Sequence, residues 1–357
     1  MGNSKIKSNY LGILIVIAMI LILVTGCSSS DKNNKKTDVQ DEEVNVSKES
    51  QETEAEDIVS DNPLVGETVL TVGDEKVSYS EFILYLKYIK VYYENIFGET
   101  IWDYDLGDTT IGELAKQDIV DTIAERKIAK KQWREYDVVI TEEDEMNIKK
   151  DSSDYLKNLT KEDISYYGIT EEVVYQFFFD NLMAERVYDA TTMNIDTNIP
   201  DEEAKQITIC YLLVSTKRLN SQGELVDVNG EEKKAAYAKA QELLNQAATV
   251  EDFATFAKAN TDGAKIEMTF GKNDIEEAVA NAAFALKTGE MSNIIESEDG
   301  YLILYCIDDY NEDATLAKKE EIIDDRQMSL FQDLFQDWQK EVKIELNTDI
   351  WDKINFD

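Results

Sequence analysis

The first 62 residues divide into an apolar run and a polar stretch. Residues 11–24 are apolar apart from one glycine, and Lys5 and Lys7 precede them. This run is shorter than the ~20 residues of a membrane-spanning helix and is typical of the hydrophobic region of a secretory signal peptide. Residues 28–62 contain no aromatic side chain and are rich in Ser, Asn, Asp, Glu and Lys. That composition predicts a disordered tether.

Residues 63–199, between the chain's two prolines, have a mostly helical pattern. Short apolar pieces flank Gly73-Asp74 at its start, which favours a hairpin. Ser78 and Thr110 each stand three residues before a glutamate, the spacing of a capping box, and apolar residues at helical spacing follow both. Further helical spacing occurs near residues 141–159 and 170–193.

The pattern changes after Pro200. QITICYLLVST is a β-rich apolar run, and GYLILYCID at residues 300–308 is another. Between them, GELVDVNG favours a small hairpin, and helical spacing predicts three helices. These helices cover residues 233–247, 250–260 and 275–287. This order predicts one structural unit over residues 200–311, in which a strand is followed by three helices and then by a second strand.

A long helix is predicted over residues 314–342, and KIEL follows it as a short strand. The helix is too long and too apolar on one side to stand alone, so we expect it to pack on the helices of residues 63–199. The fold class is therefore α+β, with residues 312–357 returning to the first domain. The apolar side chains of the helix are Leu330, Phe331, Leu334, Phe335, Trp338 and Val342.

Val24-Thr25-Gly26-Cys27 ends the amino-terminal apolar run and is followed by serines. These residues resemble a bacterial lipobox, which implies a signal peptide over residues 1–26, cleavage before Cys27 and a lipid on that cysteine. The resemblance predicts a chain anchored at the extracytoplasmic face of a cell membrane, with a Gram-positive surface favoured. The alternatives are an ordinary signal peptide or an uncleaved anchor with an incidental cysteine.

The net charge of the chain restricts the kinds of partner that it can bind. The chain has 74 acidic and 36 basic side chains, a formal net charge of −38, and loss of Lys5 and Lys7 with the signal peptide changes it to −40. Such a charge argues against a nucleic-acid partner, which needs a basic footprint. It also repels an anionic lipid surface, so the lipid on Cys27 would have to provide the membrane attachment.

The chain contains no histidine and only three cysteines. Beyond Cys27, Cys210 and Cys306 alone do not make a disulfide framework. The absence of histidine excludes Ser-His and Cys-His nucleophile systems, and together with so few cysteines it disfavours a zinc site. We expect neither a metal nor a cofactor.

Several stretches together resemble one family. FALKTGEMSNIIESEDGYLIL at residues 284–304 and DFATFAKANTD at residues 252–262 resemble parts of a parvulin-type peptidyl-prolyl isomerase domain. VLTVGDEKVSYSEFILYL and the long C-terminal helix resemble the chaperone domain of PrsA/SurA-like foldase lipoproteins. The resemblance covers most of residues 66–357. It implies a degenerate isomerase domain, an antiparallel sheet with helices, inserted in a helical chaperone body that binds unfolded or nascent secreted polypeptides.

The chemistry of such an isomerase involves no covalent bond. It must lower a rotation barrier of ~18–20 kcal/mol that amide resonance sets. An apolar pocket holds the proline ring, and polar groups stabilise the twisted amide, which is differential binding of a transition state. Such a site does not strictly need histidine.

The resemblance places the family's site on particular residues. The two histidine positions fall on Tyr211 and Leu302, and the cysteine or aspartate position falls on Asp262. This implies catalytic roles for Asp262 and Tyr211; the alternative is an ordinary strand tyrosine and loop aspartate. The implied substrate-binding positions are Phe270, Ile275, Val279, Ser297 and Leu302.

Strand parity separates the two remaining cysteines. If Tyr211 and Leu302 face one site, odd positions of the first strand and even positions of the last share a face. Cys210 and Cys306 then lie on opposite faces of the sheet. We expect them to form no disulfide.

Two groups of aromatic residues in residues 63–199 could form the core or a crevice for unfolded chains. Core packing is favoured for most of them, although the first helix has aromatic residues on more than one face. The groups are Tyr85, Tyr88, Tyr92, Tyr93, Phe97, Trp102 and Tyr104, and then Tyr175, Phe177, Phe178 and Phe179.

Three functions follow from these patterns. The first is a foldase with prolyl isomerase activity, weak or lost because both histidine positions are changed. The second is a non-enzymatic holdase chaperone on the same fold. The third, a solute-binding lipoprotein, would need repeated β-α units in two lobes, and the sequence lacks that pattern. The resemblance favours the first and leaves its activity open.

Overall fold

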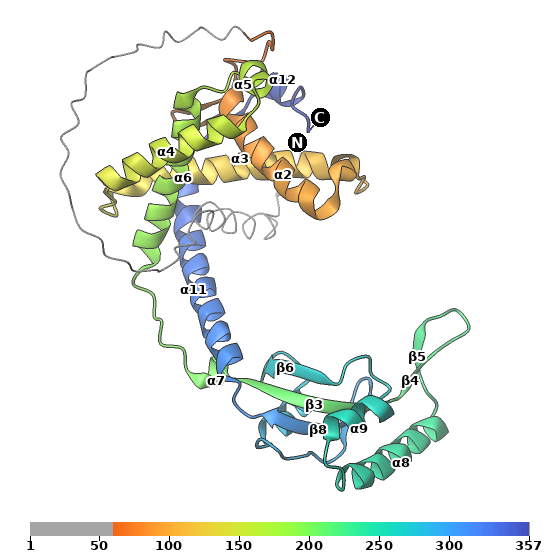
Figure 1. The fold of residues 1–357 in the computed structure, drawn as a ribbon. Coiled ribbons are helices and arrows are strands. Elements are labelled where there is room, and N and C mark those ends of the chain that lie inside the picture. Colours follow the sequence, from red (N-terminus) through yellow and green to blue (C-terminus); the bar gives the residue numbers. More distant parts are fainter. Residues whose placement is uncertain (1–59, 357) are drawn as a thin grey trace, which may run out of the picture. The chain divides into compact units, whose positions relative to one another are not determined.

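The computed structural model describes residues 60–356 (Figure 1). The described chain forms two compact units: a helical unit of residues 60–193 and 330–356, and a sheet unit of Asn194–Ser329. The predicted signal peptide, the lipid site at Cys27 and the tether up to residue 59 lie outside the described residues. Asn62, at the end of the predicted tether, is already buried in the helical unit. Within residues 60–356, no helix is long and apolar enough to cross a membrane.

The helical unit begins with the expected hairpin. β1 (Thr68–Val72) and β2 (Glu75–Ser78) pair antiparallel on either side of Gly73-Asp74. β9 (Ile344–Leu346), the strand predicted from KIEL, pairs with the other edge of β1, so the sheet order is β2-β1-β9. The two ends of the described chain are thereby joined by backbone hydrogen bonds.

The predicted N-caps at Ser78 and Thr110 are present, each as a single hydrogen bond without the reciprocal glutamate contact of a capping box. Ser78 accepts a hydrogen bond from the backbone N–H of Glu81, and Thr110 accepts one from that of Glu113. These caps satisfy amide groups that a helix start leaves unpaired. The helices are α2 (Tyr79–Phe97), α3 (Ile111–Lys130), α4 (Glu142–Asn158), α5 (Lys161–Tyr167) and α6 (Glu171–Thr192), with 3-10 turns η1 (Glu99–Asp103) and η2 (Lys131–Arg134).

The end of α11 (Glu312–Lys340) packs inside the helical unit, as its apolar face predicts. The ring centroid of Phe331 lies 5.1 Å from that of Tyr188 on α6 and 5.8 Å from that of Trp338. After α12 (Thr348–Trp351), Phe356 stacks on Trp102 with 3.9 Å between ring centroids. The carboxyl-terminal segment therefore completes the aromatic core of this unit.

A buried ionic cluster joins α2, α3 and α6. Asp180 is fully buried and accepts hydrogen bonds from Lys127 Nζ at 2.5 Å and Lys130 Nζ at 2.8 Å. Glu81 Oε1 lies 2.7 Å from Lys127 Nζ. Burial raises the pKa of Glu81. Burial disfavours the charged form of Lys127, but the nearby Asp180 and Glu81 outweigh it and raise the pKa of the lysine.

The sheet unit is built on an antiparallel sheet in the order β6-β3-β8-β7. Its central strands are β3 (Gln206–Ser215) and β8 (Gly300–Asp308), the two strands that the sequence predicts. The edge strands β6 (Glu267–Gly271) and β7 (Ile295–Ser297) are not predicted, because both are short and β6 pairs with a strand far away in sequence. The fold class is α+β, as expected.

Helices cover both faces of this sheet. α8 (Gly230–Ala247) and α9 (Phe253–Asn260) pack on one face, and α10 (Glu277–Phe284) packs on the other. α10 is shorter than the helix predicted over residues 275–287. The predicted hairpin contributes only one arm, since β5 (Leu225–Asp227) pairs with β4 (Lys217–Leu219) rather than within GELVDVNG. The remaining helix is α7 (Asp201–Ala204).

The two cysteines of the sheet unit lie on opposite faces, as parity predicts. Cys210 stands opposite Tyr305, and Cys306 stands opposite Ile209. Both are free and buried.

The ionic cluster predicts a large loss of stability when its central carboxylate is neutralised. Asp180→Asn removes the buried carboxylate that Lys127 and Lys130 share, and it leaves Lys127 paired with Glu81 and Lys130 paired with Glu75. We therefore expect the free energy of unfolding in urea to fall by about 3 kcal/mol, the lower end of the cost of removing one partner of a buried pair. Asp154→Asn is the matched control, because Asp154 pairs with Lys150 and Lys157 at an exposed position. We expect that change to leave the stability nearly unchanged. Equal losses in the two variants would contradict the role given to burial.

The positions of the cysteines predict two unpaired thiols. In the Cys27→Ser chain, purified without reductant, we expect no rapid reaction of a thiol reagent with the folded protein because Cys210 and Cys306 are buried. Unfolding in guanidinium should then release both thiols. A count of zero in the unfolded, unreduced chain would show that they form a disulfide after all.

Candidate functional site

One face of the four-stranded sheet carries the apolar residues predicted for the site. In the β3–β8 pairing, Tyr211 stands opposite Leu304, and Leu213 stands opposite Leu302. Directly opposed residues of an antiparallel pair project to the same side. Tyr211 and Leu302 therefore share a face, and it is the face that α10 covers, called here the α10 face.

The α10 face gathers one apolar cluster from β3, β6, β8 and α10. Phe270 and Val279 are buried, at 4% and 7% exposure, and Tyr211, Ile275 and Leu302 are half-buried against them. The structure thus brings these five predicted residues together. Eight further members of the cluster were not among the predicted site residues. They are Ile207, Ile209 and Leu304 of the central strands, Met268 and Ile295 of the edge strands that the sequence did not predict, and Ala283, Phe284 and Leu286 in or just after α10.

The start of β8 approaches β3 so closely that only glycine fits. Gly300 has φ +144°, and a Cβ atom there would stand 2.2 Å from Val214 O and 2.8 Å from Thr216 N. Glycine is the residue that adopts such a backbone at little steric cost. Glycine at position 300 therefore permits the close strand approach in which Leu302 stands opposite Leu213.

The polar residues predicted for the site take part in structural contacts. Ser297 lies at the end of β7, and its hydroxyl donates to Gly300 O at 3.0 Å across the β7–β8 turn. Asp262 Oδ2 accepts from the Ser215 N–H at 3.0 Å, and its Oδ1 lies 3.2 Å from Lys239 Nζ on α8. The carboxylate thus fastens the α9–β6 loop to the end of β3 and to the helix on the other face of the sheet.

The hydroxyl of Tyr211 is the polar group that the α10 cluster offers. Burial is the main cause that raises the pKa of this phenol, so the hydroxyl stays protonated and neutral near pH 7. Across residues 60–356, no hydrogen bond or ion pair links it to Asp262. The same part of the chain holds no group of three His, Cys, Asp or Glu side chains arranged for a metal ion.

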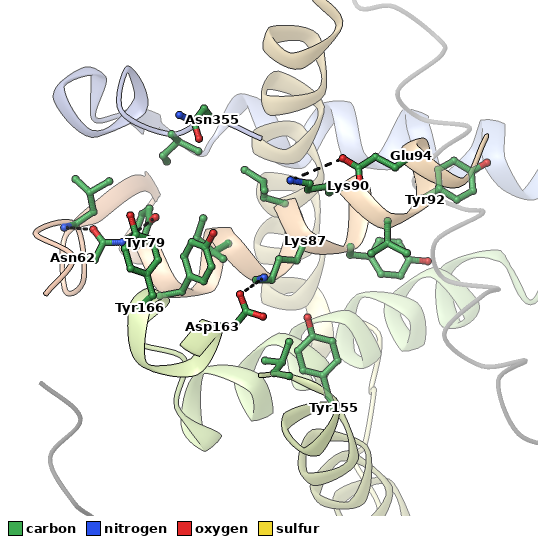
Figure 2. A pocket seen from close by; sticks show the side chains of 18 of the residues that line it. Asn62, Tyr79, Lys87, Lys90, Tyr92, Glu94, Tyr155, Asp163, Tyr166 and Asn355 are labelled. Carbon is green, nitrogen blue, oxygen red and sulfur yellow. Dashed lines mark hydrogen bonds and ion pairs between the residues drawn. The ribbon is translucent and has the colours of Figure 1, made fainter. Parts of the chain in front are cut away.

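A second candidate surface is a groove of about 1050 Å³ on the helical unit. Figure 2 shows α2 crossing it, with Tyr155 of α4 and Asp163 and Tyr166 of α5 on its side. Lys87 Nζ pairs with Asp163 Oδ1 at 2.9 Å, and Lys90 Nζ stands 3.9 Å from Glu94 Oε1. Tyrosine rings and paired charges therefore line this groove.

The aromatic residues that sequence analysis grouped together divide between core and surface. Tyr85, Trp102 and Phe177 are buried, and the ring centroids of Tyr85 and Phe177 lie 4.7 Å apart. Tyr88 and Tyr92, in contrast, line the groove. Core packing thus accounts for part of the group and a surface groove for another part.

Comparisons with known proteins bear on both units. Residues 213–308 match the family model described as Rotamase, the PPIC-type PPIASE domain. The foldase protein PrsA of Clostridium tetani is 24% identical over 201 residues, covering 53% of this chain and 57% of the relative. The chain thus matches little more than half the length of that relative.

Two further similarities are longer. The foldase protein PrsA of Caldanaerobacter subterraneus subsp. tengcongensis is 23% identical over 250 residues, which is 67% of this chain and 72% of the relative. Among solved structures, a peptidylprolyl isomerase, PrsA from Bacillus cereus, is 17% identical with a TM-score of 0.30, covering 79% of this chain and 90% of that one. This chain is therefore similar to PrsA foldases and carries a PPIC-type PPIase domain at residues 213–308.

Proposed function

We propose that this chain is an extracytoplasmic foldase that binds unfolded secreted polypeptides and isomerises their prolyl bonds weakly. The observation that carries the proposal is the apolar cluster of Tyr211, Phe270, Ile275, Val279 and Leu302 on one face of a PPIC-type domain. A proline ring is apolar and compact, so such a cluster is a suitable seat for it. Burial of the ring would contribute at ~25 cal/mol per Å² removed from water.

Catalysis at this site would come from binding the twisted amide better than the planar one. Twisting removes the conjugation between nitrogen and carbonyl. The neutral Tyr211 hydroxyl can donate a hydrogen bond to the substrate, and the apolar surroundings strengthen such a bond. Because the second histidine position of the family holds Leu302, a second polar contact is missing. We therefore propose weak activity.

The holdase alternative rests on the same cluster. Leu302 enlarges the apolar surface at a position where the family has a polar group, which favours holding a peptide over reacting with it. The isomerase and holdase hypotheses differ only in whether the site binds the twisted transition state of the prolyl bond better than its planar ground state.

We place the chain at the outer face of the cell membrane, attached through lipid on Cys27. The lipobox-like sequence before Cys27 supports this proposal, and the strongly acidic composition makes attachment by charge alone unfavourable. Metabolic labelling with a radioactive fatty acid, compared between wild type and Cys27→Ser, tests it.

Isomerase activity is tested by following cis/trans exchange of a proline peptide by NMR. We expect a slow acceleration that Tyr211→Phe lowers about five- to tenfold, since one hydrogen bond of about 1 kcal/mol is lost. The rate should stay flat from about pH 6 to about pH 9, because no histidine titrates there. The neutral phenol donates below its raised pKa, so any loss should come only at higher pH.

Asp262→Asn is the companion variant in this assay. Its carboxylate is already bound to Ser215 and Lys239, so we expect the rate to change by less than about twofold. Two results would contradict the role given to Tyr211. One is a catalysed rate that decreases when the pH is lowered below ~6.5, and the other is complete loss of the rate in Asp262→Asn although the protein is folded. A rate equal to that of the peptide alone would leave the holdase function.

Client binding is tested by suppression of aggregation of a reduced, unfolded secreted protein. Leu302→Asp places a charge in the apolar cluster, which is unfavourable for binding an apolar ligand. We therefore expect this variant to lose most of the suppression of aggregation that the sheet unit provides. Leu316→Asp is the control, since Leu316 lies on α11 and is 57% exposed. Equal protection by both variants would mean that clients do not use the α10 face.

A further inference from the structure

Six tyrosines contribute to the lining of the groove on the helical unit. Its lining includes Tyr79, Tyr88, Tyr92, Tyr155, Tyr166 and Tyr167, which come from α2, α4 and α5. Tyr166 and Tyr92 are 52% and 37% exposed. The rings therefore present flat apolar surfaces together with hydroxyl groups along one groove (Figure 2).

The carboxylates of the groove are committed to partners within the protein. Asp163 Oδ1 binds Lys87 Nζ at 2.9 Å, and its Oδ2 accepts from Thr160 Oγ1 at 2.9 Å. Glu94 Oε1 accepts from Trp102 Nε1 at 2.9 Å. Both carboxylates thus already pair with groups of the protein itself.

The hydroxyl donors of the groove, in contrast, remain free for a ligand. Among residues 60–356, no hydrogen bond is recorded for the hydroxyls of Tyr88, Tyr92, Tyr155 or Tyr166. The Tyr79 hydroxyl accepts from Asn62 Nδ2 at 3.3 Å and keeps its own proton. The groove therefore offers aromatic faces and hydroxyl groups that can donate to the carbonyl groups of a ligand.

We propose that this groove binds extended, proline-containing segments of unfolded polypeptides in the polyproline II conformation. In that conformation the backbone makes no internal hydrogen bonds, and each proline lacks an N–H group. Such a segment presents carbonyl acceptors and apolar rings, which match donors and aromatic walls. Aromatic-lined grooves recognise proline-rich segments for this reason and because the ligand is already ordered.

Other ligand classes fit the groove less well. A β-strand or a saccharide carries N–H or O–H donors that would compete with its acceptors for the same tyrosine hydroxyls, whereas proline offers an apolar ring and no N–H. The inference rests on the proposed client binding and gives it a second site. Clients would be held near their prolines by the helical unit, separately from the α10 face.

The test is fluorescence anisotropy of the full chain with two labelled peptides. One is a proline-rich peptide without charges, and the other has the same length with glycine at every proline. We expect the proline-rich peptide to bind at least about tenfold tighter. Equal affinities would overturn the proposal, as would competition by neutral oligosaccharides at lower concentration than by the peptide.

Variants locate the binding. The double variant Tyr92→Ser and Tyr166→Ser should lower the affinity for the proline-rich peptide by about tenfold. The double change of the same residues to Phe should lower the affinity less, because the rings remain and only the hydroxyl groups are lost. Tyr104→Ser with Tyr237→Ser is the control, since both tyrosines are exposed and lie outside the groove. Loss in the control alone, or no loss in the groove variant, would contradict the site.

The outcome is separable from that of the proposed function. The groove variant should keep the wild-type rate on a short prolyl peptide, because Tyr211 and Leu302 are unchanged. A groove variant that keeps the wild-type affinity for the proline-rich peptide, in a chain that still suppresses aggregation, would refute the groove and leave the foldase. A groove that binds the peptide in a chain without isomerase or holdase activity would support the groove and refute the foldase.

Discussion

The pairing of β3 with β8 is the interaction on which the candidate site depends. Eight residue pairs hold these strands, from Thr208 opposite Asp308 to Ser215 opposite Gly300. The register decides which side chains meet, because a slip by one residue would move every side chain to the other face. Gly300 secures one end, since any larger residue would collide with Val214. This register gathers Tyr211 and Leu302 on the α10 face and leaves Cys210 on the other.

The composition of the α10 face then limits its chemistry. It is an apolar surface with one neutral phenol, and Ser297 and Asp262 are engaged in turn and loop contacts. A surface of this kind can bind a proline ring but has little to stabilise charge. Prolyl isomerisation tolerates that limit, because its transition state differs from the ground state in amide twist rather than in bond making. Binding is therefore the property that this site retains most clearly.

Sequence patterns were sufficient where local signals and parity decide the structure. The caps at Ser78 and Thr110, the hairpin at Gly73-Asp74, and the opposite faces of Cys210 and Cys306 all follow from spacing. Strand β6 could not be predicted, because a short edge strand is specified by its distant partner rather than by its own residues. Contacts between residues that are distant in sequence also could not be predicted. They include the pairing of Asp262 with Lys239 and the groove that tyrosines of three helices line together.

The central claim is that the α10 face seats a proline-containing segment. It is tested most directly by NMR titration of the assigned chain with an unlabelled, short prolyl peptide, mapping the amide shift changes on β3 and β8. The account predicts changes at Tyr211, Leu213 and Leu302, which are half-buried on the α10 face, with much smaller changes at Leu212 and Ile303, which are buried on the opposite face. Changes confined to the opposite face, or none in the sheet unit at saturating peptide, would contradict it.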